Sequence, residues 1–256
     1  MTDPSADDEW QARALAAFPC EIVETTGEEA LTRWEQLKSA GRGVPVVVGD
    51  LSGILRAFSE DEEDARRPVE EILAAADAIR FPEGLFRMRQ DQVRAALGLL
   101  RELDPSGADE IGEEEEEPPL GEWPGEIAPS IGLSVARDVA TDEPLSKVHI
   151  LLVPTSDPTT VPAYLQWGGW NACPAAEYHV AALRHWRDRY GAELVGMDAD
   201  TLNIRVARKP ATCEEAIALA RLQHVYCSDI VEQGTETISV LAAGLMAHDW
   251  WFFWWD

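Results

Sequence analysis

Two tryptophans enclose a pair of glycines immediately before a predicted helix. The residues concerned are Trp167, Gly168, Gly169, Trp170 and Asn171. The helix is predicted over 174–190, since proline is favoured in a first turn and Gly191 can end the last one. Free N–H groups at a helix N-terminus and flat indole surfaces together favour an anionic or planar ligand. A core in which both indoles are packed and Asn171 caps the helix explains the same residues.

Cysteine and histidine side chains offer a possible metal site. Cys213 and Cys227 lie at opposite ends of one predicted helix, roughly 21 Å apart at 1.5 Å per residue, so they cannot share an ion. A reduced set of Cys173, His224 and Cys227 remains, because His224 and Cys227 share a helical face. These three residues could bind a metal, or the two thiols could form a redox-sensitive disulfide. Buried thiols beside a hydrogen-bonded histidine are the alternative interpretation.

A further polar group is predicted on the strands of the C-terminal half. Asn203 and Arg205 alternate with apolar residues, and His149 of an earlier strand is expected on the same face, where Trp251 or Trp255 would complete a pocket. Asp229, Glu232 and Gln233 follow a helix and are expected near the Gly-Gly loop. Exposed hairpin polarity is the favoured alternative for Asn203 and Arg205, and turn formation is sufficient to explain the second group.

Standard catalytic signatures do not occur in the sequence. We find no H-E-x-x-H, G-x-S-x-G, P-loop or dinucleotide-binding pattern. No catalytic residue and no cofactor is therefore predicted.

The elements that must position these side chains follow a β-α-β-β-α-(α)-β order in the C-terminal half. Strands are predicted over 148–153, 194–197, 201–207 and 250–255. Helices are predicted over 174–190, 212–226 and 236–247, the second opened by the capping box of Thr212 and Glu215. This order is typical of a ferredoxin-like α/β (α+β) sandwich with an antiparallel or mixed sheet.

The last predicted strand is aromatic on both faces. Trp250, Phe252 and Trp254 point one way, whereas Trp251, Phe253 and Trp255 point the other. Because a bare aromatic face would be a large apolar patch, both faces must be covered. The N-terminal part, a partner or a ligand could cover the second face, and we expect the N-terminal part.

The N-terminal part has a β-α-β start followed by helices. Strands are predicted over 21–24 and 44–48, and helices over 28–39, 69–79 and 85–103. Five consecutive glutamates, 113–117, then precede several prolines and glycines, which predicts a linker or exposed loop. We therefore divide the chain into a helix-rich part (1–108), an acidic Pro/Gly stretch (109–126) and a C-terminal domain (127–256).

The charge and composition of the chain indicate which kinds of molecule it is expected to bind. The chain of 256 residues has 47 acidic and 21 basic side chains, a formal net charge of -26. Such a field repels phosphate backbones and favours a basic protein partner, although acids that only keep the protein soluble explain the charge too. Nucleic acid is not an expected partner. With no apolar run of about 20 residues, an acidic start and no C-x-x-C pair, we expect a cytoplasmic protein without a membrane span.

A set of short motifs carries a family resemblance over residues 147–256. The motifs are Trp167-Gly168-Gly169-Trp170-Asn171, Cys173-Pro174, Arg189-Tyr190-Gly191-Ala192-Glu193, Tyr226-Cys227-Ser228-Asp229-Ile230-Val231, Gln233-Gly234 and Trp254-Trp255-Asp256, together with Trp186. In these the chain resembles a bacterial domain-of-unknown-function family, number 4253. The resemblance implies a bacterial cytoplasmic protein and carries no established activity or cofactor.

These observations lead to three hypotheses of function. The first is a protein- or ligand-binding module, in an immunity or regulatory role, with an acidic surface and the aromatic-glycine loop as its site. The second is an unrecognised enzyme with a Trp/Asn/His/Arg pocket. The third is a structural subunit. The oligomeric state is left open.

Overall fold

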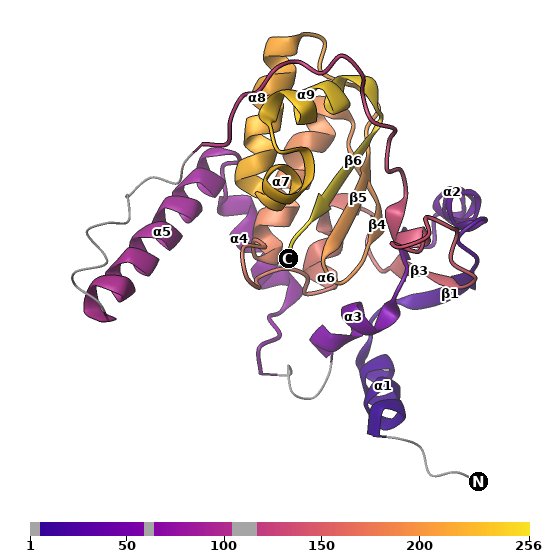
Figure 1. The fold of residues 1–256 in the computed structure, drawn as a ribbon. Helices are drawn as coiled ribbons and strands as arrows, with labels where there is room; N and C mark the ends of the chain where they lie inside the picture. The colour runs from indigo at the N-terminus through magenta and orange to yellow at the C-terminus, as the bar shows by residue number, and fades with distance from the viewer. Residues whose placement is uncertain (1–5, 59–63, 104–116) are drawn as a thin grey trace.

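The computed structural model describes residues 6–58, 64–103 and 117–256, whose strands form one six-stranded mixed sheet (Figure 1). Neighbouring strands are antiparallel, except for the parallel pair β2 and β4. The strands in spatial order are β1 (Glu21–Thr25), β3 (Val148–Val153), β2 (Val44–Val48), β4 (Glu193–Met197), β5 (Thr201–Arg205) and β6 (Trp250–Trp254).

The inner strands β2 and β3 are almost continuously apolar because both of their faces are buried. Val46 and Val48 pack into the larger core on one face, whereas Val47 packs into a second core on the other. Runs of β-branched residues are favoured on such surfaces, where the branched side chains fill space between neighbouring strands. The sheet thus has a core on each side.

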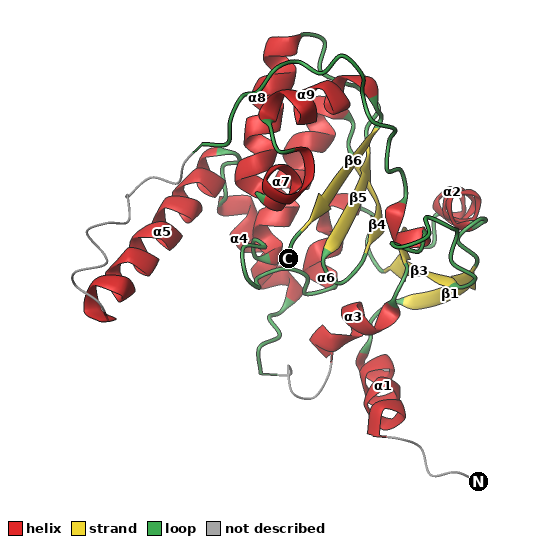
Figure 2. Ribbon diagram, viewed as in Figure 1, coloured by secondary structure: helices red, strands yellow, loops and turns green. Residues whose placement is uncertain are grey.

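Helices cover the larger core on the face of β4, β5 and β6 (Figure 2). They are α7 (Ala176–Tyr190), α8 (Cys213–Tyr226) and α9 (Ile238–Ala247). Trp186 of α7 is fully buried and stacks on Phe253 of β6, with ring centroids 5.4 Å apart. Aromatic side chains therefore make up much of the contact between helices and sheet.

The remaining helices extend this layer or pack outside it. Three elements lie towards the β1 end of the sheet: α1 (Ala6–Ala17), α3 (Leu51–Leu55) and the 3-10 turn η1 (Arg56–Phe58). Helix α4 (Val69–Ala78) packs on α7, and helix α5 (Glu83–Leu103) contacts α8. Short elements connect the rest: η4 (Pro158–Thr160), α6 (Val161–Tyr164) and the π-helix η5 (Ile230–Thr235). The π-helix and the short helices were not predicted from the sequence.

The opposite face of the sheet is covered by α2 (Ala30–Ala40) and the 3-10 turn η3 (Ser134–Ala136). Trp34 of α2 is almost fully buried, and its Nε1 donates to the Pro45 carbonyl over 2.7 Å. Val135 of η3 contributes to the same core. Segments from both sides of the acidic Pro/Gly stretch, α2 before it and η3 after it, therefore pack on this face of the sheet.

The chain is a mixed α/β protein, as predicted, but the ferredoxin-like topology is not confirmed. That topology would pair the 148–153 strand with the closing strand. Instead β3 pairs with β1 and β2, and β6 pairs with β5 at the edge of the sheet. The reason is that β2, which is apolar on both faces, lies between β3 and β4. Strands from both sides of the acidic stretch therefore share one sheet.

The predicted linker lies partly outside the described residues, which resume at residue 117. From there the chain follows an irregular path along the first turn of α9. The backbone N–H groups of Ile238 and Ser239 donate to the carbonyls of Pro119 and Leu120 over 3.1 and 2.8 Å. These bonds satisfy two N–H groups that have no partner within the helix and attach the segment to α9.

Candidate ligand-binding site at the edge of the sheet

The Gly-Gly loop is packed into the core. Trp167 is 4% exposed, and its Nε1 donates to the Asp198 carbonyl over 2.8 Å. Its indole lies 4.7 Å from the ring of His179 and 5.6 Å from that of Trp255, between centroids. Gly168 has a φ of +106°, and a Cβ there would meet the Pro174 carbonyl at 2.2 Å. The loop therefore needs glycine for close packing, and protein groups contact the Trp167 indole.

Two other predicted site residues meet at Asp256. Asn171 Nδ2 donates to the Asp256 carbonyl over 3.1 Å, and the Asp256 backbone N–H donates to Asp229 Oδ2 over 2.9 Å. Asn171 does not cap α7, whose N-cap residue is Ala175. Half-buried Trp170 contacts Trp167 edge-on, with centroids 5.0 Å apart. The loop and Asp229 are thus brought together, as expected.

The polar residues predicted to share a pocket are separated by the sheet. Asn203 is fully buried on the η3 side, where its Oδ1 accepts from the Val135 N–H over 3.1 Å. Arg205 lies on that face too and forms an ion pair with Glu35 at 3.4 Å. Trp255 belongs to the opposite core. The reason is strand alternation, since Trp255 shares its face with the inward residues of β5 rather than with Asn203.

His149 also faces away from Asn203. It alternates with Ile150, which packs in the η3-side core, so its side chain lies on the other face of the sheet. Desolvation and the nearby Lys147 lower the pKa of its imidazole. The predicted combination of His149, Asn203, Arg205 and Trp255 in one pocket is therefore wrong.

The predicted metal ligands do not converge. His224 Nε2 lies 3.4 Å from Glu232 Oε1, Cys173 Sγ lies 3.5 Å from His179 Nε2, and Cys227 Sγ donates to the Trp254 carbonyl over 2.9 Å. Among the described residues, no cluster of three His, Cys, Asp or Glu side chains could hold a metal ion. Cys173 and Cys227 are free thiols, and burial raises the pKa of Cys227 to about 12.

A buried polar pair of side chains lies beside Cys173, one of the predicted metal ligands. His179 Nδ1 is hydrogen-bonded to the Tyr226 hydroxyl, and both residues are fully enclosed. Desolvation lowers the pKa of His179 to about 3, so the ring is neutral. The helical spacing within α7 and α8 places both residues towards the sheet, but no motif in the sequence links them.

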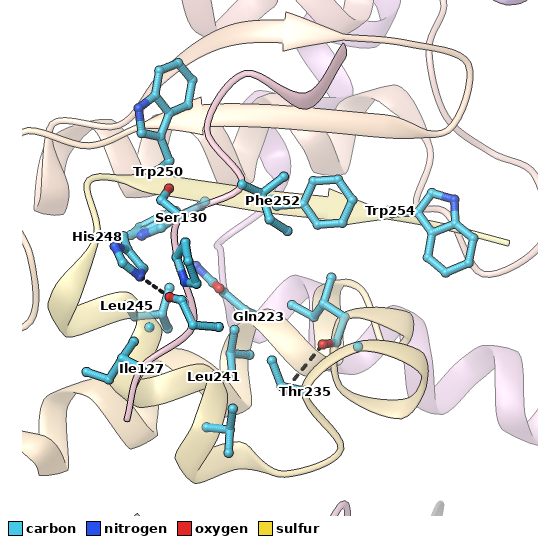
Figure 3. A pocket seen from close by; sticks show the side chains of 18 of the residues that line it. Ile127, Ser130, Gln223, Thr235, Leu241, Leu245, His248, Trp250, Phe252 and Trp254 are labelled. Carbon is cyan, nitrogen blue, oxygen red and sulfur yellow. Dashed lines mark hydrogen bonds between the residues drawn. The ribbon is translucent and has the colours of Figure 1, made fainter. Parts of the chain in front are cut away.

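A cavity of about 390 Å³ opens beside β6 (Figure 3). It is bounded by β6, α9, η5 and the segment 124–132, and Gln223 of α8 also lines it. Its apolar wall includes three half-buried aromatic residues of β6 and two leucines of α9: Trp250, Phe252, Trp254, Leu241 and Leu245. The alternation that buries Trp251 and Phe253 in the core thus directs every second aromatic side chain of the closing strand to this side.

Local structure keeps the cavity open. Gly244 of α9 lines the cavity, and a Cβ at this position would have no neighbouring atom within 4 Å among the described residues, the backbone of α9 aside. The segment 124–132 is held in place by His248, whose Nε2 contacts the Ala128 carbonyl at 2.8 Å. A missing side chain on the helix and an anchored loop therefore leave space that the fold does not fill.

Gln223 places an unpaired donor in the cavity wall. The residue is 1% exposed, and within the described part of the chain its Nε2 has no hydrogen-bond partner. Buried side-chain amides are usually paired, because an unpaired one costs about 1–3 kcal/mol. Figure 3 shows the amide directed between β6 and α9. A ligand with an acceptor group would satisfy it.

The charged residues of the lining are acidic. Glu126 and Asp229 line the cavity, whereas lysine and arginine do not occur among the described residues around it. Two of the predicted site residues, Asp229 and Gln233, are part of the lining. Gln223 was missed because a single glutamine in a helix carries no sequence signal. The alternating aromatic pattern of the closing strand was the available clue.

Comparisons with known proteins find one match to a family model, in the C-terminal part of the chain. Residues 149–256 match the family model "Domain of unknown function (DUF4253)". The match begins within β3 and includes all of the cavity lining except the segment 124–132. No curated protein and no solved structure matches the chain. Among the helices of the described residues, none has the length and apolar character required to cross a bilayer.

Proposed function

We propose that this protein, in which residues 149–256 match the DUF4253 model, is a binding protein whose ligand occupies the cavity beside β6. The observation that carries the proposal is the unpaired Nε2 of Gln223 in a largely apolar wall. Ligand sites are commonly apolar, with a few polar groups that orient the ligand. A binding protein in a regulatory or immunity role needs no catalytic group at this position.

The lining suggests the chemistry of the ligand. An apolar or aromatic body would contact Trp250, Phe252 and Leu241, and a carbonyl-type acceptor would accept from Gln223 Nε2. Anions are disfavoured because Glu126 and Asp229 lie at the cavity and the chain has a net charge of -26. The proposed ligand is therefore neutral or cationic.

Titration of the whole protein with small aromatic probes tests this proposal. Benzamide, toluene and benzoate share a ring but differ in their acceptor and charge, and the indole N–H resonances of Trp250 and Trp254 report on binding. Benzamide is expected to bind more tightly than toluene, and benzoate most weakly. Gln223→Leu should weaken benzamide binding about fivefold, equivalent to one hydrogen bond, and leave toluene binding unchanged.

A matched pair of glycine variants tests the location. Gly244→Leu places a side chain in the open space of the cavity and should abolish binding of all three probes. Gly98→Leu is the control, since Gly98 also lies in a helix, α5, where a Cβ would have no neighbour within 4 Å in the part of the chain that the structure describes. Both changes favour helix formation, so loss of folding does not explain a loss of binding. Equal binding by the two variants, or tighter binding of benzoate, would contradict the proposal.

A further inference from the structure

The closing strand β6 has one edge that is not paired in the sheet. It is the last strand in the order, with β5 on its other side. The bonds Trp255 N–H to Asp200 carbonyl (3.1 Å) and Val206 N–H to Asp249 carbonyl (2.8 Å) flank the β5–β6 ladder. Because bonding alternates in antiparallel pairs, the backbone groups of Trp250, Phe252 and Trp254 point away from β5.

The contact of Cys227 confirms this direction. Its Sγ donates to the Trp254 carbonyl over 2.9 Å from the side opposite β5. The outward N–H and C=O groups of Trp250 and Phe252 have no hydrogen-bond partner within residues 6–58, 64–103 and 117–256. Both residues line the cavity. Unpaired backbone groups therefore border the space proposed to hold the ligand.

Within β6 itself, this edge lacks the residues that usually protect an edge strand against pairing. Natural proteins protect exposed edge strands with lysine, proline, charged residues or bulges. The sequence of β6 is Trp-Trp-Phe-Phe-Trp, without charge or proline, and its register with β5 is regular. An unprotected aromatic edge is the kind of surface to which an extended peptide adds as a strand.

From these features we infer that the β6 edge and its cavity receive an extended segment of a basic partner protein, which pairs with β6 as an additional strand. The inference rests on the proposed function, because it names the ligand of the same site. Glu126 and Asp229 at the cavity, and the net charge of -26, favour lysine or arginine in that segment. Cationic side chains would also be attracted to the faces of Trp250 and Trp254.

The dimensions suit a short segment. The outward groups of Trp250 and Phe252 provide two donors and two acceptors, which pair with about three residues of an extended chain at roughly 3.3 Å per residue. Alternate side chains of the segment would enter the cavity, and the others would lie outside it. The partner would thus contribute a strand whose inward residues are apolar or basic.

Capped peptides test the inference on the full-length protein. The probes are acetyl-Val-Lys-Val-Lys-Val-amide, the same peptide with glutamate for lysine, and the lysine peptide with alternate backbone nitrogens methylated. The lysine peptide is expected to bind about tenfold more tightly than the glutamate peptide at low salt. Methylation should weaken it about tenfold, because two backbone hydrogen bonds are lost.

Hydrogen exchange shows where the peptide binds. The amide protons of Trp250 and Phe252 should become protected when the lysine peptide is added, and Gly244→Leu should lose this effect whereas Gly98→Leu keeps it. Equal affinity of the methylated peptide, unchanged exchange at both amides, or no peptide binding would overturn the inference. If benzamide still binds in that case, the proposed cavity site stands without strand pairing; if benzamide fails as well, both proposals fail.

Discussion

His179 and Tyr226 are hydrogen-bonded to each other inside the aromatic core, through the ring Nδ1 and the phenolic hydroxyl. Desolvation lowers the pKa of His179 and raises that of Tyr226, so both side chains are neutral. The rings of Trp167, Trp186 and Trp255 surround the pair. A polar contact thereby joins α7 to α8 within a wall of apolar rings.

Removing the phenolic hydroxyl should destabilise the protein. Tyr226→Phe leaves His179 Nδ1 without this hydrogen bond in a site closed to water, and we expect the free energy of unfolding to fall by about 1–3 kcal/mol. Urea denaturation followed by tryptophan fluorescence measures this. Tyr164→Phe, at a half-buried tyrosine that packs against the margin of the same core, is the control. Equal stability of the two variants would contradict the prediction.

The buried imidazole of His179 should also make the stability of the protein decrease in acid. Its folded pKa of about 3 lies below the ordinary value near 6.5, so the unfolded chain binds a proton that the folded protein excludes. The stability that the neutral His179 contributes is fully present above pH 6.5. As the pH falls from 6.5 towards 3, the free energy of unfolding decreases by up to about 1.4 kcal/mol per pH unit. His179→Gln should show a smaller loss between pH 6.5 and 4.5 in urea denaturation. An unchanged slope would refute the assignment.

The carboxyl group of Asp198 should have the opposite effect and make the protein less stable as the pH rises. Desolvation raises its pKa to about 6, although the N–H groups of Asp50 and Ala199 donate to its carboxylate. The folded protein therefore keeps a proton that the unfolded chain releases, and this carboxyl reduces stability as the pH rises from 4 to 6. We expect Asp198→Asn to gain about 2 kcal/mol relative to the natural protein between pH 4 and 7.

The same charge change at an exposed site is the control for Asp198. Glu28→Gln removes one exposed carboxylate near α2 and corrects for the lower net charge. Thermal unfolding at pH 4, 5, 6 and 7 compares the three proteins. If Glu28→Gln and Asp198→Asn respond equally to pH, general charge repulsion rather than the environment of Asp198 is the cause.

Much of the secondary structure could be predicted because it depends on local patterns. The capping box of Thr212 and Glu215 opens α8, where Thr212 accepts from the Glu215 N–H over 3.1 Å. Gly191 ends α7 with a φ of +62°, a conformation that suits glycine. Periodicity also located β3, α7 and β6. These signals lie within one or two turns of chain, so the sequence displays them directly.

The sheet order and the cavity could not be predicted because they depend on distant segments. β2 resembles any buried strand, and its sequence does not indicate that it lies between β3 and β4. Gln223 became a candidate only once β6, α9 and the segment 124–132 were placed around it. The prediction that both faces of β6 must be covered was useful, but the space beside Trp250 and Trp254 is only partly filled.

The side chain of Arg89 attaches α5 to the rest of the protein. Its guanidinium donates to the carbonyls of Ala172, Val225 and Tyr226 over 2.8–3.0 Å, and so joins α5 to the C-terminal end of α8. Arg89→Met should lower the free energy of unfolding by about 2 kcal/mol and speed amide exchange in α5. Arg94→Met is the control, since Arg94 is exposed on the same helix and pairs with Asp91. Equal exchange in the two variants would contradict this attachment.

The place of β2 sets the order of events during protein synthesis. β2 leaves the ribosome well before its neighbours β3 and β4, so the backbone hydrogen-bonding groups on its two edges have no strand to pair with until β3 and β4 have been made. The recognisable DUF4253 stretch starts within β3 and lacks β2. If residues 149–256 were expressed alone, β3 and β4 would lack the strand that lies between them in the sheet. The residues that match the family model therefore lack one inner strand of the sheet to which they belong.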